Sequence, residues 1–349
     1  MLPRSLAMLA AAGSMTALSC GSSSNNNTNT GAGTHYHYVV SRVMVPTEAG
    51  QAGMFGLDLN GDGVVDNQLG SILAALNGEG INAQVDIDEA VFGGNITLLV
   101  DVQTTDPTFM SATNTGIQVF EGADANPPAC NSGEVVTCGS GTDMSCTGCQ
   151  HDLTGSASFS ISASSPTNPA LTGSITGGTY TAGPGTLSLQ IALGSGSPID
   201  LDLIGARVKA TDMTATTIGS QSGMTGGIIF GGGVSQTDLN TQVLPQVVTL
   251  AQGEIEKHCF GNEGSGGTGV CDCDSTGTTI LGLLGAEGSA ATGSGAGSPA
   301  CTITLADIQA STTASSLLAP DITINGMPAL SLGVLAYAVG ADFSNGSAD

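Results

Sequence analysis

Residues 58–67 carry side chains well suited to binding a hard cation. The segment reads DLNGDGVVDN, and its oxygen-bearing side chains recur at every second position, as the ligands of an EF-hand calcium loop do. The first, third, fifth, seventh and ninth loop positions correspond to Asp58, Asn60, Asp62, the carbonyl of Val64, and Asp66. Gly63 takes the sixth position, where the chain must turn sharply. The spacing predicts a calcium site.

The loop lacks the last ligand of a complete EF-hand. Its twelfth position is Leu69 instead of a bidentate glutamate, so we expect a weaker site or one closed by another residue. A dissociation constant of about 0.1–1 mM would still be useful outside the cell. The alternative is an acidic turn without metal, in which Asp66 or Asn67 caps the helix that follows.

Two other segments repeat parts of this pattern. Asp321, Thr323, Asn325 and Gly326 have the spacing of the first half of the loop, but Ala329 replaces its last acid. Residues 301–307, CTITLAD, resemble the exit half of an EF-hand. We interpret both as degraded scaffolds.

The cysteines predict disulfide bonds. Apart from Cys20, eight of the nine fall into two groups of four, which are Cys130, Cys138, Cys146 and Cys149, and Cys259, Cys271, Cys273 and Cys301. An even number in an exported chain indicates four disulfides, and we expect pairing within each group. Zinc is the alternative, because Cys146 and Cys149 have CxxC spacing near His151, and His258 precedes Cys259.

The first residues are typical of an export signal. After Arg4 an uncharged run rich in Ala, Leu and Met leads to Cys20, and it is too short for a permanent transmembrane helix. Ala17, Leu18 and Ser19 resemble a bacterial lipobox, so we expect lipid on Cys20, with an ordinary signal peptide as the alternative. The expected partner is therefore a membrane, bound through the lipid anchor. The predicted location is the cell envelope, anchored to the outer membrane and either periplasmic or surface-exposed.

Three parts are expected along the chain. Residues 1–20 form the signal peptide, 21–35 a polar, flexible tether, and 36–349 one globular domain with a glycine-rich, cysteine-containing loop region at 260–300. The formal net charge of -24 excludes nucleic acid as a partner, because phosphates would be repelled. Without Trp and with 3% aromatic residues, the core must be largely aliphatic.

Periodicity favours strands over helices. Residues 36–46 are rich in β-branched and aromatic residues and end at a proline, which predicts the first strand. Apolar residues alternate within 96–102, 157–161, 187–193 and 199–203, and a slip near Gly205 suggests a bulge. Helices are expected around 69–76 and 86–92, after Ser235 with a kink at Pro245, and after Thr304, and the closing strands at 321–326 and 330–339. We predict an α+β fold: a single domain with an antiparallel β-sheet, a few helices and disulfide-stapled loops.

Together the lipobox-like start, the VPT-containing first strand, the LDLNGDGVVDNQLG loop and the closing LLAPDITINGMPALSLGV resemble uncharacterised cell-surface lipoproteins of the myxobacterial type. This resemblance implies an envelope location and calcium at Asp58, Asn60, Asp62 and Asp66. It implies no particular activity.

We therefore expect a non-enzymatic surface lipoprotein with a binding, adhesion or structural role, whose protein or glycan ligand the sequence does not name. The alternative is a secreted hydrolase whose acid and base lie far apart, such as Asp101 or Asp202. No GxSxG, HExxH or P-loop sequence supports an enzyme. His35 and His37 adjoin the tether, and we interpret them as solvated side chains, with binding of a transition metal as the alternative.

Overall fold

The computed structural model describes residues 31–78, 80–139, 145–191, 198–262, 270–284 and 302–343. The expected signal peptide with Cys20, the tether up to residue 30, Cys301 and the side chain of Cys271 lie outside the described residues.

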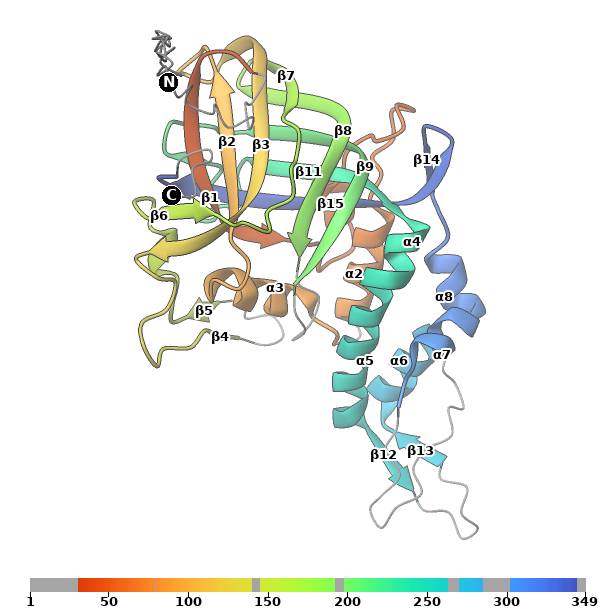
Figure 1. Ribbon diagram of the computed structural model, residues 1–349. Helices are drawn as coiled ribbons and strands as arrows, with labels where there is room; N and C mark the ends of the chain where they lie inside the picture. The colour runs from red at the N-terminus through yellow and green to blue at the C-terminus, as the bar shows by residue number, and fades with distance from the viewer. Residues whose placement is uncertain are drawn as a thin grey trace, which may run out of the picture.

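Eight antiparallel strands close into a β-barrel (Figure 1). Their order around the barrel is their order along the chain, and the first strand pairs with both the second and the last. The barrel strands are β1 (Thr34–Met44), β2 (Leu98–Thr104), β3 (Ser111–Asn126), β7 (Leu171–Thr176), β8 (Thr179–Ile191), β9 (Ile199–Thr211), β11 (Gly227–Ser235) and β15 (Met327–Gly340).

The predicted α+β fold is therefore wrong: the domain is mostly β, and its sheet is a closed barrel instead of an open layer. Closure depends on pairing between β1 and β15, where Tyr38 lies opposite Gly340 and Met44 opposite Leu335. Residues so far apart in sequence leave no local signal of their pairing. Buried and exposed residues alternate most clearly in β9, whereas nearly every residue of β2 and β15 is buried. The first strand begins at Thr34, two residues earlier than predicted.

Side chains fill the inside of the barrel. Alternate residues such as Tyr38, Val100, Leu201 and Phe230 share one buried core. An eight-stranded barrel is just wide enough to be filled in this way. The predicted bulge lies at Gly205, whose φ of +60° leaves it unpaired between Ala206 and Ile204, the partners of two adjacent residues of β8.

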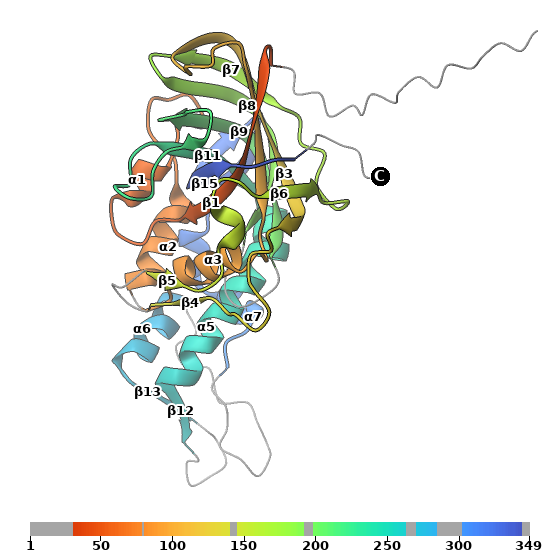
Figure 2. The same ribbon diagram turned by 90° about the vertical axis from the view of Figure 1, so that its left-hand side faces the viewer.

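Helices cover one end of the barrel. The helices are α1 (Gln51–Phe55), α2 (Gln68–Gly78), α3 (Ala83–Phe92), α4 (Gln236–Asp238), α5 (Leu244–His258), α6 (Ser275–Leu284), α7 (Leu305–Ala310) and α8 (Thr312–Leu317). Leu73 of α2, Ile87 of α3 and Leu244 of α5 belong to the same core as the barrel interior. Both ribbon views place α2, α3 and α5 beneath the barrel (Figures 1 and 2).

Where a kink was expected near Pro245, the structure has a short π-helical segment directly before α5. Ser235 caps α4 by accepting a hydrogen bond from the Asp238 N–H, and residues 239–243 then form a π-helical turn before α5. Proline has no N–H and its ring collides with the carbonyl four residues earlier, so a widened turn accommodates it.

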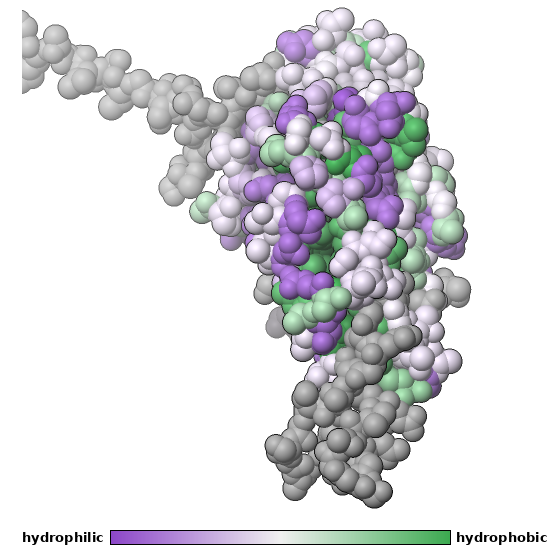
Figure 3. Space-filling view, turned by 90° about the vertical axis from the view of Figure 1, so that its right-hand side faces the viewer, coloured by the Kyte–Doolittle hydropathy of each residue, from purple (hydrophilic) through white to green (hydrophobic). Residues whose placement is uncertain are grey.

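Apolar surface shows between polar side chains on the side that carries β14 (Ile322–Ile324) and α8 (Figure 3).

One buried ion pair joins the barrel to α3. The Arg42 guanidinium donates two hydrogen bonds to the Asp88 carboxylate, at 2.9 and 2.7 Å, and only 2% of the Asp88 side chain is exposed. The Gln84 side-chain amide donates to Asp88 at 3.0 Å and bridges to the backbone of Val43 and Val45. The Asp88 carboxylate is therefore buried, with both a charged partner and a neutral one.

We expect Asp88→Ala to lower the free energy of unfolding by about 3 kcal/mol, because it leaves the Arg42 charge largely buried without a partner. The double variant Arg42→Met/Asp88→Leu should lose less, since no charge remains buried. Denaturant unfolding of the disulfide-intact protein measures both. Lys257→Met breaks the exposed pair with Glu254 and should cost less than about 1 kcal/mol; an equal loss in Asp88→Ala and Lys257→Met would contradict the assignment.

Candidate functional site

The acidic loop lies between α1 and α2, outside the barrel and beside the hairpin of β14 and β15 (Figure 1). A backbone bridge between Leu57 and Asp66 closes its base. Leu59 is buried against Ile322 and Ile324 of that hairpin. One apolar side chain thus fixes the loop to the barrel while its neighbours stay in solvent.

Within the loop, side-chain oxygens accept backbone N–H groups. The Asp58 carboxylate accepts from Gly61 at 2.6 Å and from Gly63 at 3.0 Å. The Asn60 carbonyl oxygen accepts from Asp62 N–H at 2.9 Å, and Asp62 accepts from Val64 N–H at 2.8 Å. These hydrogen bonds hold the segment in a tight turn that brings its oxygen-bearing side chains close to one another in sequence order.

Asp66 occupies a less exposed position. Its carboxylate accepts the Leu59 N–H at 2.7 Å. Burial raises the pKa of Asp66, and the negative charges of Asp62 and Asp321 raise it further. Three acids therefore concentrate negative charge at the inner end of the loop, where a cation would relieve their repulsion.

The twelfth loop position supplies no ligand, because Leu69 is buried in the core. Asn67 caps α2, as one alternative expected: its side-chain oxygen accepts the Gly70 N–H at 3.0 Å and the Gly333 N–H at 2.8 Å. Asp321 does not close the loop in this structure, since its carboxylate accepts the N–H and hydroxyl of Ser331 at 2.7 and 2.5 Å. Water would have to complete a coordination shell here.

The two fainter repeats have other roles. Asn325 and Gly326, with φ of +53° and +81°, form the two-residue turn between β14 and β15. Thr304 and Asp307 form a reciprocal capping box at the start of α7.

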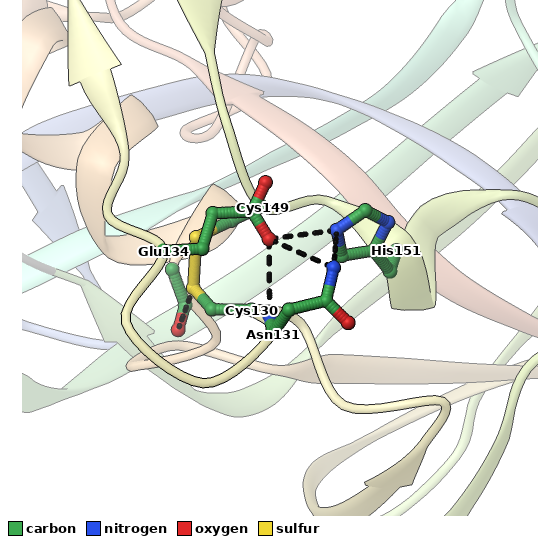
Figure 4. The surroundings of a disulfide bond; sticks show 6 residues. Cys130, Asn131, Glu134, Cys149 and His151 are labelled. Atoms are coloured by element: carbon green, nitrogen blue, oxygen red, sulfur yellow. Dashed lines mark hydrogen bonds and ion pairs between the residues drawn. A yellow bond between two sulfur atoms is a disulfide. The ribbon is translucent and has the colours of Figure 1, made fainter.

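The prediction of disulfide bonds is confirmed, with Cys130–Cys149, Cys138–Cys146 and Cys259–Cys273 formed. Each joins cysteines of the same sequence group. Because Cys146 and Cys149 belong to different disulfides, the zinc alternative at their CxxC is wrong. His151 instead approaches Glu134 at 2.8 Å beside the Cys130–Cys149 bond (Figure 4).

The acids named for a hydrolase lie apart. Asp101 is on β2 and Asp202 on β9, with β3, β7 and β8 between them in the sheet. Asp202 accepts a hydrogen bond from Ser188. Asp101 is buried beside His35 and His37, a grouping that our reading of the sequence missed.

Glu121 of β3 is a buried carboxyl group whose protonation is affected by Asp200 of β9. Burial and the nearby Asp200 raise the pKa of Glu121 to about 7. Among the described residues, no donor reaches Glu121 Oε1. A proton shared with Asp200 would supply that missing hydrogen bond, so the folded state favours protonated Glu121.

Comparison of the chain with protein-family models, curated proteins and solved structures gives no match. The disulfides indicate a protein of an oxidising space, extracellular or within the envelope. Among the described helices, none has the length and hydrophobicity needed to cross a lipid bilayer.

The Glu121 pair makes stability depend on pH. A pKa raised on folding stabilises the protein fully below the pKa of the unfolded chain, and this contribution is lost as pH rises toward 7. We expect Glu121→Gln to match the native protein at pH 4 and to exceed its free energy of unfolding by roughly 1 kcal/mol at pH 8. The effect is modest because Asp200 is exposed to water.

Thermal melts across that pH range measure this difference. Glu48→Gln, which removes the same charge from an exposed residue, is the control. A pH profile of Glu121→Gln that parallels the native one would rule out the carboxyl pair as its cause.

Proposed function

We propose that this chain is an envelope lipoprotein whose barrel domain is stabilised by calcium and serves a non-enzymatic binding, adhesion or structural role. The observation that carries the proposal is the conformation of the acidic loop, in which Asp58, Asn60 and Asp62 already accept backbone N–H groups within one tight turn. Binding a hard cation there requires little further ordering of the chain.

The architecture supports a scaffold role. Buried side chains such as Tyr180 and Phe230 fill the barrel, so a macromolecular ligand would contact its outer surface or loops. The loop is fixed by Leu59 against the hairpin that leads into β15, the strand that closes the barrel. A cation in the loop would therefore also stabilise the hairpin at the start of β15.

Calcium should raise the melting temperature of the purified protein. A ligand that binds only the folded state at ten times its dissociation constant adds about 1.4 kcal/mol, which corresponds to a rise of a few degrees. Asp58→Asn and Asp62→Asn keep an oxygen acceptor for the backbone but remove charge, and each should abolish most of the rise. Melts with calcium, with magnesium and with chelator measure the effect.

Glu48→Gln is the control for this series, because it removes an exposed charge outside the loop. Magnesium should stabilise less, since it demands a near-ideal octahedral shell. If the native protein melts at the same temperature with calcium and with chelator, the calcium part of the proposal is contradicted. That result would not bear on the lipid anchor.

The anchor is tested separately. Native protein from the membrane fraction should begin at an acylated Cys20, because several acyl chains are needed for stable attachment. Cys20→Ser should release the domain into the soluble fraction with its disulfides intact. Mass spectrometry of the intact protein and cell fractionation provide the readouts, and an N-terminus at any other residue would refute lipidation.

A further inference from the structure

We propose that His35, His37 and Asp101 bind a divalent transition-metal ion of the zinc class on the outer wall of the barrel, where β1 begins. Asp101 of β2 lies directly opposite His37 of β1 in the pairing register. Residues two apart in a strand point to the same side. Because Tyr36 and Tyr38 pack into the core, both histidines point outward, where Asp101 meets them.

The candidate ligand atoms are already spaced to share one ion. His35 Nδ1 lies 2.9 Å from Asp101 Oδ2, and His37 Nε2 lies 3.8 Å from Asp101 Oδ1. The ligand atoms of all three residues lie within 4.8 Å of one another. Bonds of about 2.0–2.1 Å in a tetrahedral zinc site place neighbouring ligand atoms roughly 3.3 Å apart. Small ring rotations would therefore seat the ion.

Burial gives the site its driving force. None of the Asp101 side chain is exposed, whereas 40% of His35 and 24% of His37 is. Burial of a carboxylate carries a desolvation cost that a nearby positive charge offsets. A divalent ion would supply that charge, and the exposed imidazoles leave an entry path and room for a water ligand.

Packing fixes one of the ligands. The His37 ring stacks on Phe343, with ring centroids 4.2 Å apart and planes 22° from parallel. The Ala341 N–H donates to the His37 carbonyl at 3.0 Å, which holds the C-terminal segment against β1. Because this ring is already oriented, less freedom is lost when it coordinates a metal.

The ligand set differs from that of the acidic loop. Imidazole nitrogens with one carboxylate suit zinc, cobalt, nickel or iron(II), whereas calcium requires oxygen ligands. An ion bound at His35 Nδ1 leaves the proton of the neutral imidazole on Nε2. Coordination of the ion changes no oxidation state. This inference does not depend on the calcium proposal.

The test is a titration of tag-free, chelator-treated protein with Co²⁺ and Zn²⁺. Cobalt should give the visible absorption of a low-symmetry site, and zinc should displace it. Loss of an outer-shell group typically costs roughly 10–100-fold in affinity, so His35→Gln and His37→Gln should each weaken binding at least about tenfold. Asp101→Asn is measured as well, with circular dichroism to verify its fold.

His151→Gln and His258→Gln are matched controls. Each of these histidines also contacts a carboxylate at 2.8 Å, Glu134 and Asp274 respectively, but without a second histidine in the group. They should leave the titration unchanged. The proposal would be overturned if the native protein showed no saturable cobalt binding. It would also be overturned if the His35 and His37 variants bound cobalt as tightly as the native protein does.

Discussion

The pairing of β1 with β15 is the constraint on which the rest of this structure depends. It joins the first and last strands of the barrel, and the register runs from Tyr38 opposite Gly340 to Met44 opposite Leu335. A closed sheet has no free edge, so every barrel strand can satisfy its backbone groups on both sides. Strand β15 also contacts the acidic loop through Leu59 and the start of α2 through Asn67. Gly333 shows how tightly they approach: a side chain there would meet the carbonyl of Phe55 at 2.4 Å.

Acidic side chains connect the barrel to the elements around it. Asp88 joins α3 to Arg42 of β1, and Asp321 accepts two hydrogen bonds from Ser331 of β15. Asp101 lies between two histidines at the other end of β1. The carboxylates of Asp88 and Asp101 are buried, and each has a hydrogen-bonding partner, as the cost of burying a polar group requires. In a chain with 29 acidic and 5 basic residues, cationic side chains are scarce as partners for these acids.

The acidic loop was predictable because its chemistry is local. Asp58 to Asp66 are consecutive in the chain, and Gly61 and Gly63 adopt the positive φ that such a turn needs. The histidine site was not predictable in the same way, because Asp101 is far from His35 in sequence and only the register of β1 and β2 brings them together. Two hints were present: histidines alternate with tyrosines in HYHY, and an acid interrupts the otherwise apolar LLVDV. Neither hint alone distinguishes a ligand from a solvated side chain.

Apart from β3, β7 and β11, which were not predicted, the sequence by itself determined the barrel strands, the helix caps at Ser235 and Thr304, and the grouping of the cysteines that form disulfides. All of these depend on residues close together in the chain, where periodicity and capping preferences act directly. Only the tertiary structure decided that the sheet closes, that α2, α3 and α5 cover its end, and that Asp88 is buried. These features depend on contacts between distant residues, and one local pattern is compatible with either an open or a closed sheet. That is why an α+β layer was expected from strands that in fact form a barrel.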